Sequence, residues 1–152
     1  MMKEKTVKYL KVILILVLSL TTFNFPEERP KPKGKLIVKF EGIKESKGKI
    51  KIALCNSADN YRDHENPFIG KDISAKENYV ITEFNDLPFG TYAIKAFHDA
   101  DSNDDLNTNF LGIPVEDYGF SNDARGTFGP PSWERAKFYF DSENQIIEIT
   151  IK

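Results

Sequence analysis

The chain has 152 residues, of which 40% are hydrophobic and 12% aromatic, enough for one packed domain and too apolar for a disordered chain. Its formal net charge is −2, and no block of lysine and arginine stands out after the first residues. This composition gives no support to a nucleic-acid-binding function.

The N-terminus has the layout of a secretory signal. Four lysines precede an apolar run at 12–20, and small or polar residues follow it at Thr21 and Thr22. The run is shorter than the roughly 20 residues of a membrane-spanning helix. We therefore predict that residues 1–25 are a signal peptide, with an uncleaved N-terminal anchor as the alternative. Either outcome predicts an exported domain that is periplasmic, secreted or associated with the cell envelope.

A charged, proline-rich segment at 26–34 is typical of an extended linker, so the folded domain is expected at 35–152. Within the domain, apolar residues recur with a period of two, which is typical of half-buried strands. No helical pattern is sustained; 69–78 could hold a turn or short helix, and 56–78 and 99–134 read as long loops. The pattern predicts an all-β fold, an antiparallel β-sandwich of the Ig-like or transthyretin-like kind, with about seven strands and long loops at one end. Strands are expected near 36–40, 49–54, 80–84, 91–97, 137–140 and 147–151.

Two features within these strands have structural interpretations. Cys55 is the only cysteine, so it forms no intrachain disulfide, and its alternating apolar neighbours predict a buried thiol. At 84–92, Pro88 fixes φ, Gly90 permits a positive φ, and Tyr92 can turn its hydroxyl to a backbone group. We expect a turn that leads directly into a strand.

The stretch at 98–109 holds the densest group of side-chain oxygens in the sequence. Asp99, Asp101 and Asn103 match the first three ligand positions of an EF-hand loop. The match then fails, because Asp104 replaces the glycine of the sixth position and Phe110 replaces the acidic residue of the twelfth. Two interpretations of these side chains stay open, a turn that they build themselves and a looser calcium site. The candidate metal ligands are Asp99, Asp101, Asn103, Asp105, Asn107, Asn109 and Glu116.

Three aromatic residues, Tyr118, Phe120 and Trp133, lie among the glycines and prolines of the second long loop. We expect them to cover the sandwich or, alternatively, to face a ligand such as a carbohydrate. A hydrolase that uses His98 and Ser121 is a further alternative. Adjacent strand residues point to opposite faces, however, so Asp99 is poorly placed to orient His98. We therefore predict no catalytic residues, and weak ligand contacts for His98 and the three aromatic residues.

Several blocks of the sequence occur in the order typical of one bacterial family. They are the motifs at 87–92, 97–99, 103–109, 112–122 and 129–133. On these motifs the chain resembles the exported bacterial domain of unknown function 2141 (DUF2141) from about residue 35 to 152. The family usually has Asn-Gly where this chain has Asn103-Asp104, and no activity is implied because none is assigned to it. The 87–92 turn also resembles transthyretin-like and carboxypeptidase-regulatory-like sandwiches, which implies architecture alone.

Together these features predict an exported, non-enzymatic binding or structural module, with calcium as the candidate cofactor of the 99–109 loop. Its partner is predicted to be an extracytoplasmic protein or glycan. Membrane contact is expected only through an uncleaved N-terminal segment.

Overall fold

The computed structural model describes residues 30–152. The predicted signal peptide or anchor, and the first part of the predicted linker, lie outside the described residues. Lys31–Lys152 form a single unit, and strand β1 (Lys33–Ile43) begins two residues before the expected start of the domain. No helix in this part of the chain has both the length and the apolar character that a membrane span requires.

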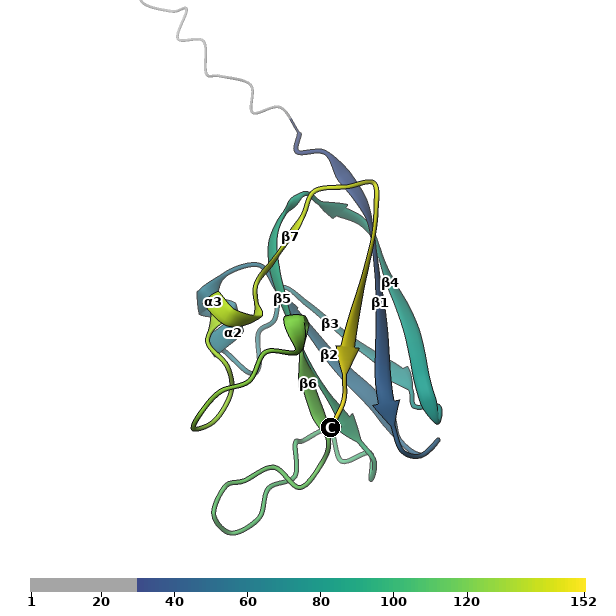
Figure 1. Cartoon of the computed structure of the whole chain (residues 1–152), viewed down its shortest axis with the longest axis vertical. Helices are drawn as coiled ribbons and strands as arrows, with labels where there is room; N and C mark the ends of the chain where they lie inside the picture. Colours follow the sequence, from purple (N-terminus) through teal and green to yellow (C-terminus); the bar gives the residue numbers. More distant parts are fainter. Residues whose placement is uncertain (1–29) are drawn as a thin grey trace, which may run out of the picture. The chain divides into compact units, whose positions relative to one another are not determined.

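The described residues fold into two sheets of three and five strands (Figure 1). After β1 the strands are β2 (Lys49–Cys55), β3 (Ile69–Ser74), β4 (Asn78–Pro88), β5 (Gly90–Asp99), β6 (Tyr118–Phe120), β7 (Phe138–Phe140) and β8 (Asn144–Thr150). The smaller sheet has the order β4-β1-β8, and the larger has the order β3-β2-β5-β6. β7 pairs with the first residues of β5, whereas β6 pairs with later ones.

Alternate side chains of the facing strands fill the space between the sheets. On β1 and β2 the residues that alternate with them face outward, so these strands have one apolar and one more polar face. This is the period-two pattern of the sequence, and it confirms the predicted all-β sandwich. The most buried members on β1 and β2 are Leu36, Val38, Phe40, Ile50, Ile52 and Leu54.

Two details of the architecture differ from the prediction. β1 pairs with β8 in parallel, since β8 is reached by a crossover from β7 in the other sheet, whereas the remaining strand pairs among residues 30–152 are antiparallel. β2 and β5 are antiparallel neighbours, with Cys55 opposite Ala93 and Lys49 opposite Asp99. The long connection after Cys55 and the long connection after Asp99 therefore start at opposite ends of this strand pair. The long loops are therefore not gathered at one end of the sandwich.

A strand occupies the segment that was expected to hold a turn or short helix. β3 starts at Ile69 and pairs with β2 along its whole length. The helices of the described chain are short and lie in the two long connections: α2 (Ala58–Arg62), the 3-10 helix η1 (Ser121–Asp123) and α3 (Trp133–Ala136). α2 begins at a capping box, in which Ser57 Oγ accepts from Asn60 N and Asn60 Oδ1 accepts from Ser57 N.

The turn before β5 forms where it was predicted, with one difference. Tyr92 Oη donates to Pro88 O at 2.7 Å, which confirms the expected backbone contact of this hydroxyl. Gly90, which would permit a positive φ, does not adopt one. In this segment Asp86 adopts that conformation instead, with φ of 54°.

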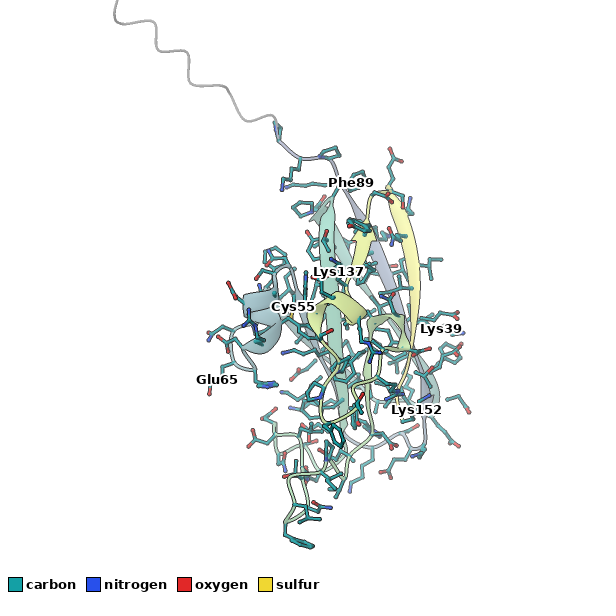
Figure 2. All side chains as sticks on the ribbon, turned by 60° about the vertical axis from the view of Figure 1, so that its left-hand side comes forward. Lys39, Cys55, Glu65, Phe89, Lys137 and Lys152 are labelled. Carbon is teal, nitrogen blue, oxygen red and sulfur yellow. The ribbon has the colours of Figure 1, made fainter. Side chains whose placement is uncertain are left out.

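The helices cover part of the outer face of the larger sheet. Cys55, Tyr61 and Phe120 belong to an apolar cluster on that face, separate from the main core. Cys55 is fully buried, which confirms the predicted buried thiol, and burial raises the pKa of this thiol. Figure 2 shows Cys55 inside the molecule beside α2, and the exposed Glu65 at the rim.

Candidate metal centre and the adjoining groove

The 100–117 loop begins at a buried carboxylate. Asp99 is the last residue of β5 and has an exposed fraction of 0%. Its Oδ1 accepts a hydrogen bond from Asn103 N and its Oδ2 accepts one from Asp104 N, both at 3.1 Å. Ser102 and Asp104 adopt positive φ, 60° and 73°, and so reverse the chain. Because short polar side chains tolerate this conformation, the turn forms although Asp104 stands where an EF-hand has glycine.

Glu116 closes the same loop from its other end. Its Oε1 accepts from Ala100 N at 3.1 Å, and its Oε2 accepts from Asn107 N at 2.9 Å. Asp101 lies between the two ends, and its Oδ2 accepts from the side-chain amides of Asn103 and Asn107 at 3.2 and 2.9 Å. Donors from the loop itself therefore hold the carboxylates in place.

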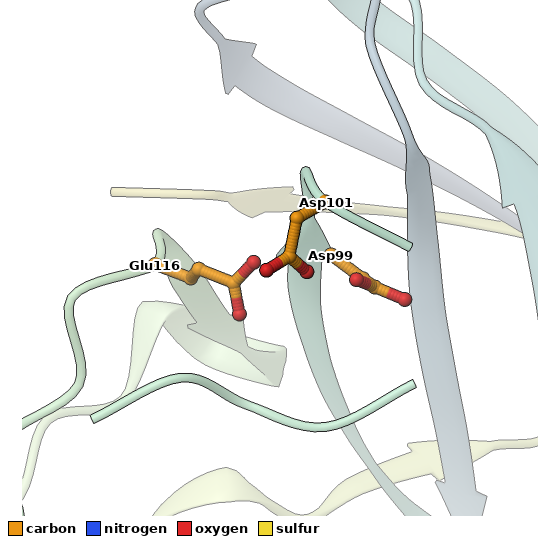
Figure 3. Close-up of side chains that lie close together, drawn as sticks. All are labelled: Asp99, Asp101 and Glu116. Carbon is orange, nitrogen blue, oxygen red and sulfur yellow. The ribbon is translucent and has the colours of Figure 1, made fainter. Parts of the chain in front are cut away.

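The side chains of Asp99, Asp101 and Glu116 lie close together (Figure 3). One side-chain oxygen from each residue lies within 4.8 Å of the others. A calcium ion lies about 2.4 Å from each of its oxygens, so two oxygens that share the ion are at most about 4.8 Å apart. These three residues, called the acidic triad below, could therefore hold a metal ion.

Two lysines on β2 face the same loop. Lys51 Nζ lies 2.7 Å from Asp104 Oδ1 and 3.0 Å from Asp72 Oδ2, and Lys49 Nζ contacts the same Asp104 oxygen. Lys49 Nζ also lies 3.8 Å from Asp99 Oδ2. The hydrogen bonds from the two lysines lower the pKa of Asp104 to about 2.

The lysine network is absent from the sequence-based prediction. Its signal is the alternation of Lys49 and Lys51 with Ile50 and Ile52, which places both lysines on the outward face of β2. The network and the triad contain two ammonium groups and five carboxylates, a net charge of −3 that attracts a divalent cation. The five carboxylates belong to Asp72, Asp99, Asp101, Asp104 and Glu116.

Four of the seven predicted ligands lie outside the acidic triad. Asn103 and Asn107 remain beside it as donors to Asp101. Asn109 lies apart, because its Oδ1 accepts from the backbone N–H groups of residues 111 and 113 and so caps the tip of the loop. Asp105 is exposed and borders a groove.

This groove, with a volume of about 1320 Å³, lies on the outer face of the larger sheet. α2 and the 129–134 segment line one side, and the 104–114 segment lines another. Trp133 packs edge-on against Tyr61, and Tyr118 packs edge-on against Phe120, with interplanar angles of 65° and 75°. The three predicted aromatic residues thus line one groove, but their rings do not form the flat platform expected for stacking against a sugar.

Lys95 provides a positive charge on the groove wall. Its Nζ donates to Tyr61 O at 2.7 Å and to Asp63 O at 3.1 Å, and it lies over the Tyr61 ring. Burial lowers the pKa of this ammonium group. Lys95 therefore ties the segment after α2 to β5 and shapes the groove.

His98 and Ser121 both have backbone partners. His98 is buried on the inner face of β5, where its Nε2 lies 2.7 Å from Lys47 O. Ser121 is fully buried, and its Oγ accepts from Ile94 N at 2.9 Å and donates to Ala136 O at 2.6 Å. These contacts give both side chains a backbone partner, so their burial has a structural explanation.

The motifs noted in the sequence run through this loop and the strands beside it. No curated protein and no solved structure matches the chain. A family model matches residues 38–148, which include the whole acidic triad and more than half of the chain. The chain therefore belongs to the bacterial family described as "Uncharacterized protein conserved in bacteria (DUF2141)".

Proposed function

We propose that the protein is an exported, non-enzymatic β-sandwich module that binds one calcium ion through Asp99, Asp101 and Glu116. The observation that carries this proposal is the convergence of three carboxylate oxygens within 4.8 Å of one another. The three residues come from the end of β5 and from the two ends of the following loop. Asp99 and Asp101 are neighbours in the sequence, and the fold of the loop brings Glu116 to them from its other end.

Coordination chemistry favours calcium over magnesium. Magnesium demands near-ideal octahedral geometry at about 2.0 to 2.1 Å, whereas calcium accepts six to eight oxygens at about 2.3 to 2.6 Å in a flexible geometry. The net charge of −3 around the triad suits a divalent ion. Water and backbone carbonyls would complete the coordination.

A bound ion would join the two ends of the 100–117 loop. Because the ion binds the folded chain, it stabilises the fold by mass action, by about 2.7 kcal/mol at a concentration one hundred times the dissociation constant. The same loop lines one side of the groove. The ion would therefore also fix the wall against which an extracytoplasmic protein or glycan lies.

The non-enzymatic part of the proposal is supported by the partners of the nucleophile and base candidates. Ser121 Oγ already donates to a carbonyl, and His98 Nε2 contacts another carbonyl. Asp99 binds the loop amides with both carboxylate oxygens, so it has no role in orienting His98. A hydrolase would need these groups to act on each other and on a substrate.

Native mass spectrometry and titration calorimetry of the full chain, with calcium and with chelator, test the proposal. We expect one calcium ion per chain. The double variant Asp101→Asn, Glu116→Gln keeps the size of both side chains and should abolish binding. Asp105→Asn is the control, because it removes one carboxylate charge from the same loop outside the triad. An ion-free wild type, or equal loss in the control, contradicts the proposal.

A further inference from the structure

The tip of the 100–117 loop presents apolar side chains to solvent. Phe110, Leu111, Ile113 and Val115 are 95%, 67%, 55% and 64% exposed. Figure 1 shows this segment as the green loop that extends beyond the ends of β5 and β6. Residues 106–115 are called the apolar hairpin below. Such a cluster of large exposed apolar side chains marks an interaction surface.

Backbone hydrogen bonds hold the apolar hairpin together, although its apolar side chains are exposed to solvent. Asn109 N donates to Ile113 O at 2.8 Å and Val115 N donates to Asn107 O at 2.9 Å, which closes a short two-stranded ladder. Of the six backbone N–H groups from 109 to 115, five bond within the hairpin, and Pro114 has none to satisfy. The five belong to Asn109, Leu111, Gly112, Ile113 and Val115.

The apolar hairpin is also free of charge. Although 29% of the residues in the chain are charged, no residue between 106 and 115 carries a charge. The 126–133 segment, which borders the same groove, is likewise uncharged and carries Phe128, 99% exposed. The nearest acidic groups, Asp105 and Glu116, flank the base of the hairpin rather than its tip.

We infer that the apolar hairpin docks into the interfacial region of a zwitterionic lipid surface. Most backbone N–H groups between 109 and 115 are bonded within the hairpin, which lowers the cost of leaving water for a lipid surface. A protein partner that adds a strand finds no free N–H group on the 113–115 edge, because Ile113 and Val115 bond within the hairpin and Pro114 has none. The phenylalanine and leucine side chains suit the boundary between headgroups and acyl chains. This inference goes beyond the proposed function and does not require the ion.

A fluorophore on the hairpin tests this contact independently of the N-terminal segment. An environment-sensitive dye is attached at Leu111→Cys in the full chain; Cys55 is fully buried and so protected from labelling. We expect the emission to shift to the blue on phosphatidylcholine vesicles and to be quenched by brominated acyl chains. Adding Phe110→Ser should weaken the partition by about tenfold to a hundredfold, the loss of one buried aromatic side chain.

The matched control carries the same dye at Tyr139→Cys, a position on β7 that is 69% exposed and lies outside the hairpin. Its emission should stay unchanged. A dye at residue 111 that remains in water overturns the inference in favour of a protein partner, and equal shifts at both positions overturn it as unspecific adsorption. Phosphatidylglycerol in the vesicles should weaken insertion in chelator, because the acidic groups at the hairpin base repel it.

Calcium binding by the chain and insertion of the apolar hairpin into lipid are measured separately. An ion that binds while the dye stays in water refutes docking and leaves the proposed function intact. A dye that enters lipid in a chain that binds no calcium supports docking and refutes the ion.

Discussion

Replacing Asp101 by asparagine should change stability in opposite directions with and without calcium. In chelator, Asp101 lies within 4.8 Å of two other carboxylates, and each like-charge pair at that distance costs about 0.9 kcal/mol even at the dielectric constant of water. Salt screening reduces the sum of the two pairs to about 1 kcal/mol. Asn103 N keeps its bond to Asp99, so the substitution leaves this donor satisfied. The variant should therefore be more stable than the wild type by about 1 kcal/mol, or about 3 to 5 °C in melting temperature.

In calcium the order should reverse. At one hundred times the dissociation constant the wild type gains about 2.7 kcal/mol. The variant loses one charged ligand of the ion and with it most of this gain. It should then be less stable than the wild type by about 2 kcal/mol.

Urea denaturation of both chains in millimolar calcium and in chelator measures these differences. Asp105→Asn serves as the control, with the same small change in both solutions because its carboxylate lies outside the triad. A variant that is more stable than the wild type in both solutions, or less stable in both, refutes the electrostatic reasoning for the triad.

Two further predictions concern contacts around the site. Ser121→Ala should destabilise the fold by about 1 to 3 kcal/mol, because it leaves Ile94 N and Ala136 O buried without their partner; an unchanged urea midpoint contradicts this. The ion pairs between Asp104 and the two lysines should be lost in acid. Asp104 has its pKa lowered to about 2, below the ordinary value of about 3.9, so its ion pairs contribute fully above about pH 4 and are lost as the pH falls to about 2. Asp104→Asn in chelator should flatten this part of the urea-midpoint profile, and parallel profiles for the variant and the wild type exclude a role for Asp104.

The sequence predicts those strands that are specified by their own alternation of buried and outward residues. On β1 from Leu36 to Phe40 and on β2 from Lys49 to Leu54, buried residues alternate with outward ones, and both strands lie near their expected bounds. β3 is not predicted as a strand because its two half-buried isoleucines, Ile69 and Ile73, are four residues apart, which is a spacing typical of a helix. Its strand form is set by pairing with β2, where Asp72 lies opposite Lys51 and forms an ion pair with it. A contact between distant segments decides this element, and no local pattern encodes it.

The candidate metal site likewise depends on contacts that the local pattern does not specify. The run of Asp and Asn residues identifies the loop, but alternation would place all of them on one side, as in an extended strand. Positive φ at Ser102 and Asp104 breaks that alternation. Asn109 consequently caps the hairpin tip and Asp105 turns to the groove, whereas Glu116 returns to Asp99 from the far end of the loop. Which oxygens meet thus depends on turn geometry that the sequence specifies only weakly.

Asp104 shows why the loop should hold its shape before any ion arrives. Its backbone N–H donates to Asp99, and its carboxylate binds Lys49 and Lys51 on β2. One residue therefore positions a member of the triad and anchors the loop to the sheet. Glycine at this position would ease the positive φ but would remove the anchor. With the loop already held by lysines, calcium has little ordering entropy to overcome, so its effect should be tighter coordination and higher stability rather than folding of a disordered segment.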